Sequence, residues 1–135
     1  MASTPVAILR GAYEAFARDG VDGLLPLLDD AIEWRNPEDS PNANVWLGHQ
    51  GVREHLALVN ESFDEIRFLP DEFDELVDGR VLVRLRFSLR AKQSGVPMEV
   101  PLWHLVTLRD GLVTHFFMYS DQQRALQAAG LHGAE

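Results

Sequence analysis

The stretch from Glu99 to Asp121 constrains the fold of this chain more than any other. It contains two runs rich in β-branched and aromatic residues, 99–108 and 112–121, which are separated by Arg109-Asp110-Gly111. An Asp-Gly pair between two such runs favours a tight hairpin turn, because glycine adopts a positive φ without a Cβ penalty. The sequence therefore predicts a β-hairpin, and the rest of the fold has to accommodate it.

His104 interrupts the first strand of this hairpin. It alternates in phase with Leu102, Val106 and Leu108, which favours an orientation toward the interior. A buried polar side chain without a hydrogen-bond partner costs roughly 1–3 kcal/mol, so a protein group or a ligand has to satisfy the imidazole. The sequence thus indicates a pocket around His104, but it does not identify the molecule that binds there.

The first third of the chain predicts two helices followed by a strand. Apolar residues recur at three- and four-residue intervals over 5–19, which is typical of an amphipathic helix, and a shorter helix is expected at 21–28. Residues 31–36 alternate as a strand, and this places Trp34 and Asn36 on the same face. The inward face of this strand is therefore expected to end in a polar amide.

The middle of the chain predicts a loop, a third helix and two strands. Residues 38–49 are rich in proline, asparagine and aspartate and are expected to form a loop, and 52–63 carries a helical apolar stripe. Residues 66–77 are polar and broken by a proline, which favours a kinked edge strand. Residues 81–90 show the clearest alternation in the chain, with one apolar face and one arginine-rich face.

The order of these elements predicts an α+β fold. A terminal helix at 122–129 is expected after the hairpin, with Asp121 as its N-cap. We expect a single domain over 1–135, in which a strongly curved, mostly antiparallel sheet wraps around the N-terminal helices.

Composition excludes several classes of partner. Twelve basic against twenty-one acidic residues give a net charge of -9, so neither nucleic acid nor an anionic membrane is expected as a partner. There is no cysteine, and the five histidines lack the spacing of metal ligands; only His104 is expected to point inward, and no metal or cofactor is expected. No export signal or membrane span is visible, so a cytoplasmic location is expected.

Five motifs spread over nearly the whole chain are similar to those of a known family. They are Tyr13-Glu-Ala-Phe-Ala-Arg-Asp-Gly20, Leu27-Leu-Asp-Asp-Ala-Ile-Glu-Trp34, Gly48-His-Gln-Gly-Val-Arg53, Leu108-Arg-Asp-Gly111 and Tyr119-Ser-Asp-Gln-Gln-Arg-Ala-Leu-Gln-Ala-Ala-Gly130. Together they resemble the SnoaL-like branch of the ketosteroid isomerase and nuclear transport factor 2-like superfamily. The resemblance implies a cone-shaped α+β barrel with a deep apolar pocket. Its functional implication is broad, because this fold hosts isomerases, polyketide cyclases, epoxide hydrolases, dehydratases and binding domains.

The resemblance also suggests catalytic roles for Tyr13 and His104. Tyr13 stands where ketosteroid isomerases carry the tyrosine that donates to a developing oxyanion; the alternative is a core tyrosine bonded to a backbone carbonyl. His104 aligns with the acidic partner of that oxyanion hole, and SnoaL-like sequences often carry histidine there. A core histidine satisfied by the protein is the alternative.

Two positions lack the bases that the relatives use. Asn36 precedes Pro37 where the steroid isomerases have the aspartate that moves the proton, and an amide cannot act as a base at neutral pH. The last strand offers Phe116, Met118 and Ser120 to the pocket, whereas polyketide cyclases have an aspartate near Met118. Steroid isomerisation and cyclisation by those bases are therefore both in doubt.

Other polar residues have simpler interpretations. Glu38 and Asp39 could supply a base from the loop, but solvated loop acids are the simpler interpretation. His49 and Arg53 are expected to anchor the loop rather than contact a ligand.

We therefore expect a pocket for an apolar small molecule, lined by Tyr13, Trp34, Asn36, Phe87, His104, Phe116 and Met118. If the protein is an enzyme, cofactor-independent acid–base chemistry is expected, with Tyr13 as oxyanion donor, His104 as acid/base or second donor, and Asn36 orienting the substrate. The alternative is a non-catalytic ligand-binding or dimerisation module.

The outer face of the sheet is expected to form a homodimer. It is too apolar for a bare surface and too charged for a core. Its predicted residues are Arg84, Arg86, Trp103, Thr107, His115, Phe117 and Tyr119.

Overall fold

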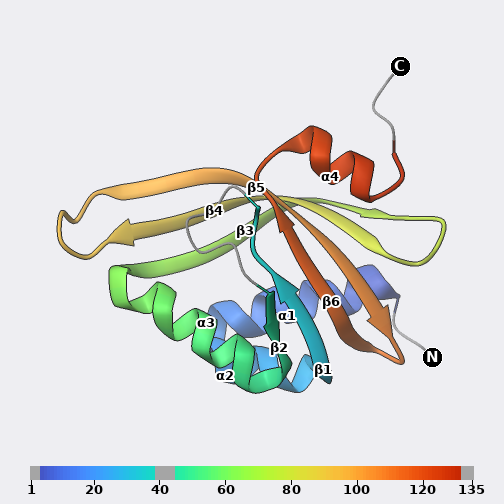
Figure 1. Cartoon of the computed structure of the whole chain (residues 1–135), viewed down its shortest axis with the longest axis horizontal. Coiled ribbons are helices and arrows are strands. Elements are labelled where there is room, and N and C mark those ends of the chain that lie inside the picture. The colour runs from blue at the N-terminus through green and yellow to red at the C-terminus, as the bar shows by residue number, and fades with distance from the viewer. Residues whose placement is uncertain (1–3, 39–44, 132–135) are drawn as a thin grey trace.

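A computed structural model describes residues 4–38 and 45–131 of the chain, which form four α-helices, one 3-10 turn and six strands (Figure 1). In chain order these elements are α1 (Pro5–Asp19), α2 (Val21–Leu24), the 3-10 turn η1 (Leu25–Leu27), β1 (Leu28–Arg35), β2 (Val45–Leu47), α3 (Gly48–Ser62), β3 (Phe63–Glu75), β4 (Val81–Ala91), β5 (Pro97–Arg109), β6 (Leu112–Tyr119) and α4 (Gln122–Ala128). Asp39, one of the acids considered above, lies outside the described residues.

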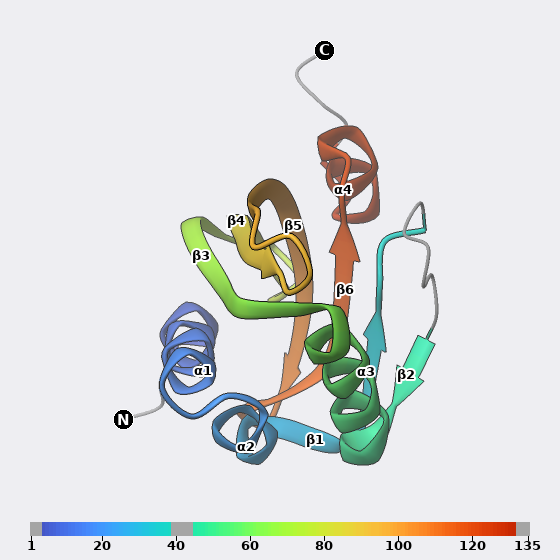
Figure 2. The same ribbon diagram turned by 90° about the vertical axis from the view of Figure 1, so that its left-hand side faces the viewer.

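The six strands form one sheet in the order β2-β1-β6-β5-β4-β3. Strands β3 to β6 are an antiparallel meander, as predicted, whereas β1 runs parallel to β6. The α+β class and the mostly antiparallel sheet are confirmed, but the sheet is open: within the described part of the chain its edge strands β2 and β3 do not pair with each other. Helices α1 to α3 cover one face of this sheet and α4 packs on the other (Figure 1; Figure 2 shows the same arrangement turned by 90°).

The predicted hairpin is present between β5 and β6. Asp110 and Gly111 have φ angles of 53° and 80°, the two positive values that a type I′ turn requires. The strands then pair from Arg109 opposite Leu112 to Trp103 opposite Tyr119, with a register shift near Thr107. Local turn chemistry therefore sets the pairing of these two strands.

The N-terminal elements differ from the prediction in two linked respects. Helix α1 begins after Thr4, whose hydroxyl accepts a hydrogen bond from the Ala7 amide, but the helix expected over 21–28 ends at Leu24. Pro26 lies in the 3-10 turn that follows, because proline has no amide hydrogen to continue a helix. Strand β1 consequently starts at Leu28, three residues earlier than expected.

The loop expected over 38–49 contains a short strand, β2, which pairs with β1 and leads into α3. His49 and Arg53, for which an anchoring role is expected, both contact other parts of the protein. Nε2 of His49 lies 2.9 Å from the Leu28 carbonyl oxygen, and Arg53 forms an ion pair with Asp22 at 2.9 Å. At the other end of the chain Asp121 is the N-cap of α4, since its carboxylate accepts a hydrogen bond from the Gln123 amide.

None of the helices in the described ranges is both long and apolar enough to cross a lipid bilayer.

Candidate functional site

An apolar cavity of about 370 Å³ lies against the face of the sheet that α3 covers. Its lining comes from β1, α3 and four further strands and consists of Trp34, Asn36, Pro37, His55, Leu56, Val59, Phe63, Ile66, Phe68, Phe87, Leu89, Leu102, Met118 and Ser120. This volume falls within the roughly 300–1,000 Å³ that is common for small-molecule sites. Among the described residues of the lining, three have polar side chains that can form more than one hydrogen bond, Asn36, His55 and Ser120, and Trp34 adds an indole N–H.

The cavity contains part of the predicted site. Trp34 reaches it from β1 and Asn36 from the position directly after that strand, because residues two apart in an extended chain share a face. Phe87 and Met118 reach it from β4 and β6. Tyr13, His104 and Phe116 are buried, but they do not belong to its lining.

Tyr13 and His104 are hydrogen-bonded to each other, although they are far apart in the sequence. The hydroxyl of Tyr13 lies 2.7 Å from Nδ1 of His104, and both side chains are buried. The second ring nitrogen of His104, Nε2, is also buried and has no hydrogen-bond partner within the described residues. The pair is thus satisfied on one side of the imidazole only.

Burial keeps this pair uncharged. It lowers the pKa of His104 to about 3 and raises the pKa of Tyr13 well above its usual value. At neutral pH the imidazole therefore has one N–H donor and one acceptor nitrogen, and the phenol keeps its proton. Such a pair can donate or accept a hydrogen bond without contributing a charge.

An aromatic layer, formed by Trp34, Phe68 and Phe116, lies between this pair and the cavity. Trp34 and Phe116 stack with ring centroids 4.3 Å apart, and Phe116 contacts the His104 ring at 4.4 Å. Trp34 and Phe68 line the large cavity and also a separate void of about 20 Å³ next to Tyr13. A ligand in the large cavity consequently meets the aromatic layer before it meets Tyr13 or His104.

His55 is the cavity residue that the sequence reasoning missed. The expectation that only His104 points inward is wrong, because His55 is buried on α3 and lines the cavity. Its ring packs between Trp46 and Trp34, with centroids 5.1 Å and 6.1 Å away, and burial lowers its pKa to about 4. The signal was present in the spacing: His55 lies three residues after Val52 and four before Val59, on the apolar stripe of α3.

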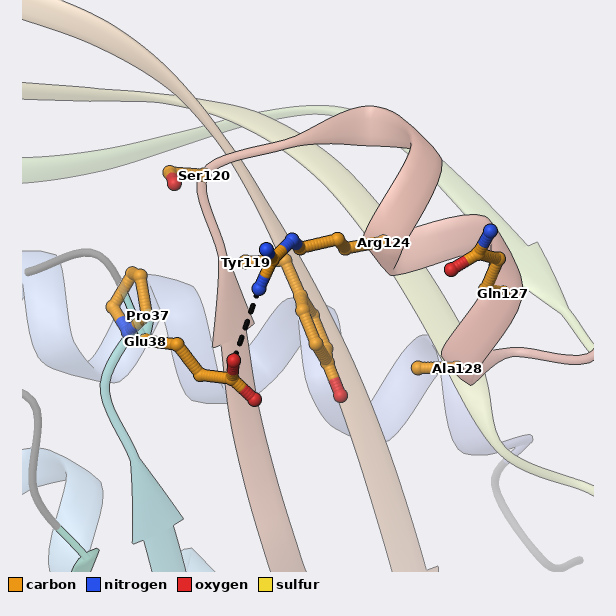
Figure 3. Close-up of a pocket in the computed structure, with 7 residues that line it drawn as sticks. All are labelled: Pro37, Glu38, Tyr119, Ser120, Arg124, Gln127 and Ala128. Atoms are coloured by element: carbon orange, nitrogen blue, oxygen red, sulfur yellow. Dashed lines mark hydrogen bonds and ion pairs between the residues drawn. The ribbon is translucent and has the colours of Figure 1, made fainter.

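A second hollow, on the outside, adjoins the cavity where β1 and β6 end (Figure 3). This outer groove of about 570 Å³ is lined by Pro37, Glu38, Tyr119, Ser120, Arg124, Gln127 and Ala128. Glu38 belongs to the groove and forms an ion pair with Arg124 at 2.9 Å (Figure 3), so it is a surface acid rather than a cavity base. Pro37 and Ser120 line both hollows.

No group of three or more histidine, aspartate or glutamate side chains in the described parts of the chain is arranged to hold a metal ion.

Residues 9–116 match the family of the SnoaL-like domain. The chain belongs to this family. No curated protein matches the chain. The SnoaL-like match runs from within α1 to within β6 and includes the cavity-lining residues except Met118 and Ser120.

Solved structures of SnoaL-like and related proteins share this fold. An NTF2-like protein from Burkholderia xenovorans LB400 is 30% identical, with 94% of this chain and 97% of that chain covered and a TM-score of 0.69. TerC, co-crystallised with polyporic acid, is 27% identical, with 94% and 98% covered and a TM-score of 0.78. A putative polyketide cyclase from Xanthomonas campestris pv. campestris, 18% identical, with 89% and 92% covered and a TM-score of 0.74, shows similarity of fold alone.

Proposed function

We propose that this SnoaL-like protein binds a neutral, largely apolar small molecule in the 370 Å³ cavity. The observation that carries the proposal is the lining, which includes aromatic and aliphatic side chains from six elements but, in the described residues, no aspartate, glutamate, lysine or arginine. A charged ligand would lose its hydration there without gaining an ionic partner, which is costly. The co-crystallisation of the similar protein TerC with polyporic acid supports a small organic molecule as the occupant.

Filling the cavity should abolish binding. Val59 lines it from the half-buried side of α3, so the larger indole of a Val59→Trp variant would occupy the space of the ligand. With 2-naphthol as a neutral probe, we expect the affinity measured by calorimetry to fall at least about tenfold, or roughly 1.4 kcal/mol of binding free energy. The matched variant Val59→Ala, which leaves the space open, should bind the probe. Unchanged affinity in a folded Val59→Trp protein would contradict the proposal.

A second candidate function is cofactor-independent acid–base catalysis of the isomerase, cyclase or hydrolase type. The observation that favours it is the hydrogen bond between Tyr13 and His104, together with the unpartnered Nε2 of His104 in the described structure. In this candidate the hydrogen-bonded pair donates one hydrogen bond to an oxygen of the substrate, from the Tyr13 hydroxyl or from Nε2 of His104, and Asn36 orients the substrate from the cavity. It requires Phe116 or Phe68 to move, because the aromatic layer separates the pair from the cavity.

We also propose that the protein forms a homodimer through the outer face of the sheet. On that face Phe117 is half-buried and contacts the Arg35 guanidinium at 4.5 Å, while Arg84 and Arg86 pair with acids of β3. Trp103 and Tyr119 pack partly against α4, which leaves the β6 side of the face as the apolar centre.

The dimer proposal predicts the effect of Phe117→Glu. A charge placed in the centre of an apolar interface should weaken association at least about tenfold, since most of the binding energy of an interface comes from a few central residues. Sedimentation velocity at micromolar concentration should show a dimer for the natural chain and a monomer for the variant. A monomer in both cases would refute the dimer.

A further inference from the structure

We infer that His55 selects the ligand, by hydrogen bonding to a hydroxyl or carbonyl oxygen of a neutral molecule inside the cavity. This inference rests on the proposed binding function and narrows the ligand to a class: apolar ring compounds that carry an uncharged oxygen at one edge.

The first argument is the placement of the ring. Helix α3 holds His55 on the same stripe as Leu56 and Val59, and all three side chains line the cavity. Trp46 on β2 and Trp34 on β1 flank the imidazole, at 5.1 Å and 6.1 Å between ring centroids. These contacts restrict the rotation of the ring, so its nitrogens keep a fixed direction relative to the cavity wall.

The second argument is the unused hydrogen-bonding capacity of His55. A neutral imidazole has one donor and one acceptor nitrogen, and burial lowers the pKa of His55 to about 4, so the ring is neutral at physiological pH. Its ring lies against two tryptophan rings, and among the described residues neither nitrogen forms a hydrogen bond. A ligand oxygen would satisfy a group that the protein leaves without a polar partner.

The third argument concerns the other polar lining residues. Asn36 and Ser120 each interact with other parts of the protein. They also lie at the end of the cavity that adjoins the outer groove, because Pro37 follows Asn36 directly and Ser120 lines both hollows. The indole N–H of Trp34 is buried and can only donate. His55, on the helix, is therefore the residue placed to donate to or accept from a ligand oxygen, and so to distinguish an oxygen-bearing ligand from a hydrocarbon of the same shape.

Paired probes test this inference. Naphthalene and 2-naphthol have the same ring system, but only the second has a hydroxyl, and both are uncharged at pH 7. One hydrogen bond should make the natural chain bind 2-naphthol about 3- to 10-fold more tightly than naphthalene, as measured by titration calorimetry. In His55→Phe, which keeps an aromatic ring between the tryptophans, this ratio should fall to about one.

A second variant and a control make the result interpretable. His55→Gln keeps a donor and an acceptor and should retain part of the preference, whereas Val59→Ala, one turn along α3, should change the affinity for both probes equally. A ratio near one in the natural chain, or an unchanged ratio in a folded His55→Phe, would overturn the inference while leaving the cavity proposal intact. Failure of both neutral probes to bind the natural chain would refute the binding function itself.

Discussion

Acidification from pH 7 to pH 5 is expected to lower the free energy of unfolding by about 4 kcal/mol, because two buried histidines stay uncharged in the folded protein. The folded-state pKa values are about 4 for His55 and about 3 for His104, both lowered by burial from 6.5. Between pH 6.5 and those values the unfolded chain binds two protons that the folded chain does not. The contribution of the two histidines to the free energy of unfolding is therefore fully present above pH 6.5 and is lost as the pH falls toward 4.

Urea denaturation at several pH values measures this effect. Below pH 6 the slope should approach about 2.7 kcal/mol per pH unit, and in His55→Phe it should fall to about half, because one proton is then taken up instead of two. Carboxylates affect the free energy of unfolding only at lower pH. The Arg90 side chain lowers the pKa of Asp64 from 3.8, and a hydrogen bond from the backbone amide of Arg80 lowers the pKa of Asp78 from the same value. A stability that stays constant from pH 7 to pH 5 would show that neither imidazole is kept neutral.

Replacing His104 by alanine is expected to destabilise the protein by about 3–5 kcal/mol. The substitution removes a fully buried ring that packs against Phe116 and Phe68, and it leaves the Tyr13 hydroxyl without its hydrogen-bond partner. The milder variant Tyr13→Phe keeps the ring contacts with Phe68 and Phe73 and should cost about 1–3 kcal/mol, since only the hydrogen bond is lost. Chemical denaturation gives both numbers.

The Tyr13→Phe variant also separates the two candidate functions. If the Tyr13–His104 pair is structural, a folded Tyr13→Phe protein should bind 2-naphthol with unchanged affinity, because the aromatic layer separates the pair from the cavity. If the pair is catalytic, Tyr13→Phe should abolish conversion of a substrate captured from cell extract while stability falls only modestly. A Tyr13→Phe protein that is less stable but still converts the captured substrate at the natural rate would refute the catalytic assignment of Tyr13 and His104.

The features that could be predicted from the sequence are those determined by neighbouring residues. Asp110-Gly111 determines a type I′ turn without help from the rest of the chain, and alternation along β4 and β5 identifies the buried faces. The cap at Asp121 is equally local. The observed bounds of these elements therefore agree with the predicted bounds within a few residues.

The features that were missed depend on contacts between distant segments. Strand β2 has three residues and forms only because β1 lies beside it, so no pattern in its own sequence indicates it. Whether Phe116 faces open space or stacks on Trp34 depends on side-chain packing, and this decides which predicted residues line the cavity. His55 was missed for a different reason: a histidine on an apolar helical stripe was treated as a surface residue.

The parallel pairing of β1 with β6 has a consequence for the order in which the protein folds. One wall of the cavity joins Trp34, in the first third of the chain, to Met118, near its end, and Trp34 pairs with Phe116 on the same strand as Met118. Contacts between such distant segments form late, because closing a long loop costs entropy before any contact compensates for it. During synthesis on the ribosome the cavity therefore cannot exist until β6 has emerged, and the fluorescence of Trp34, as it stacks on Phe116, would report the last stage of its assembly.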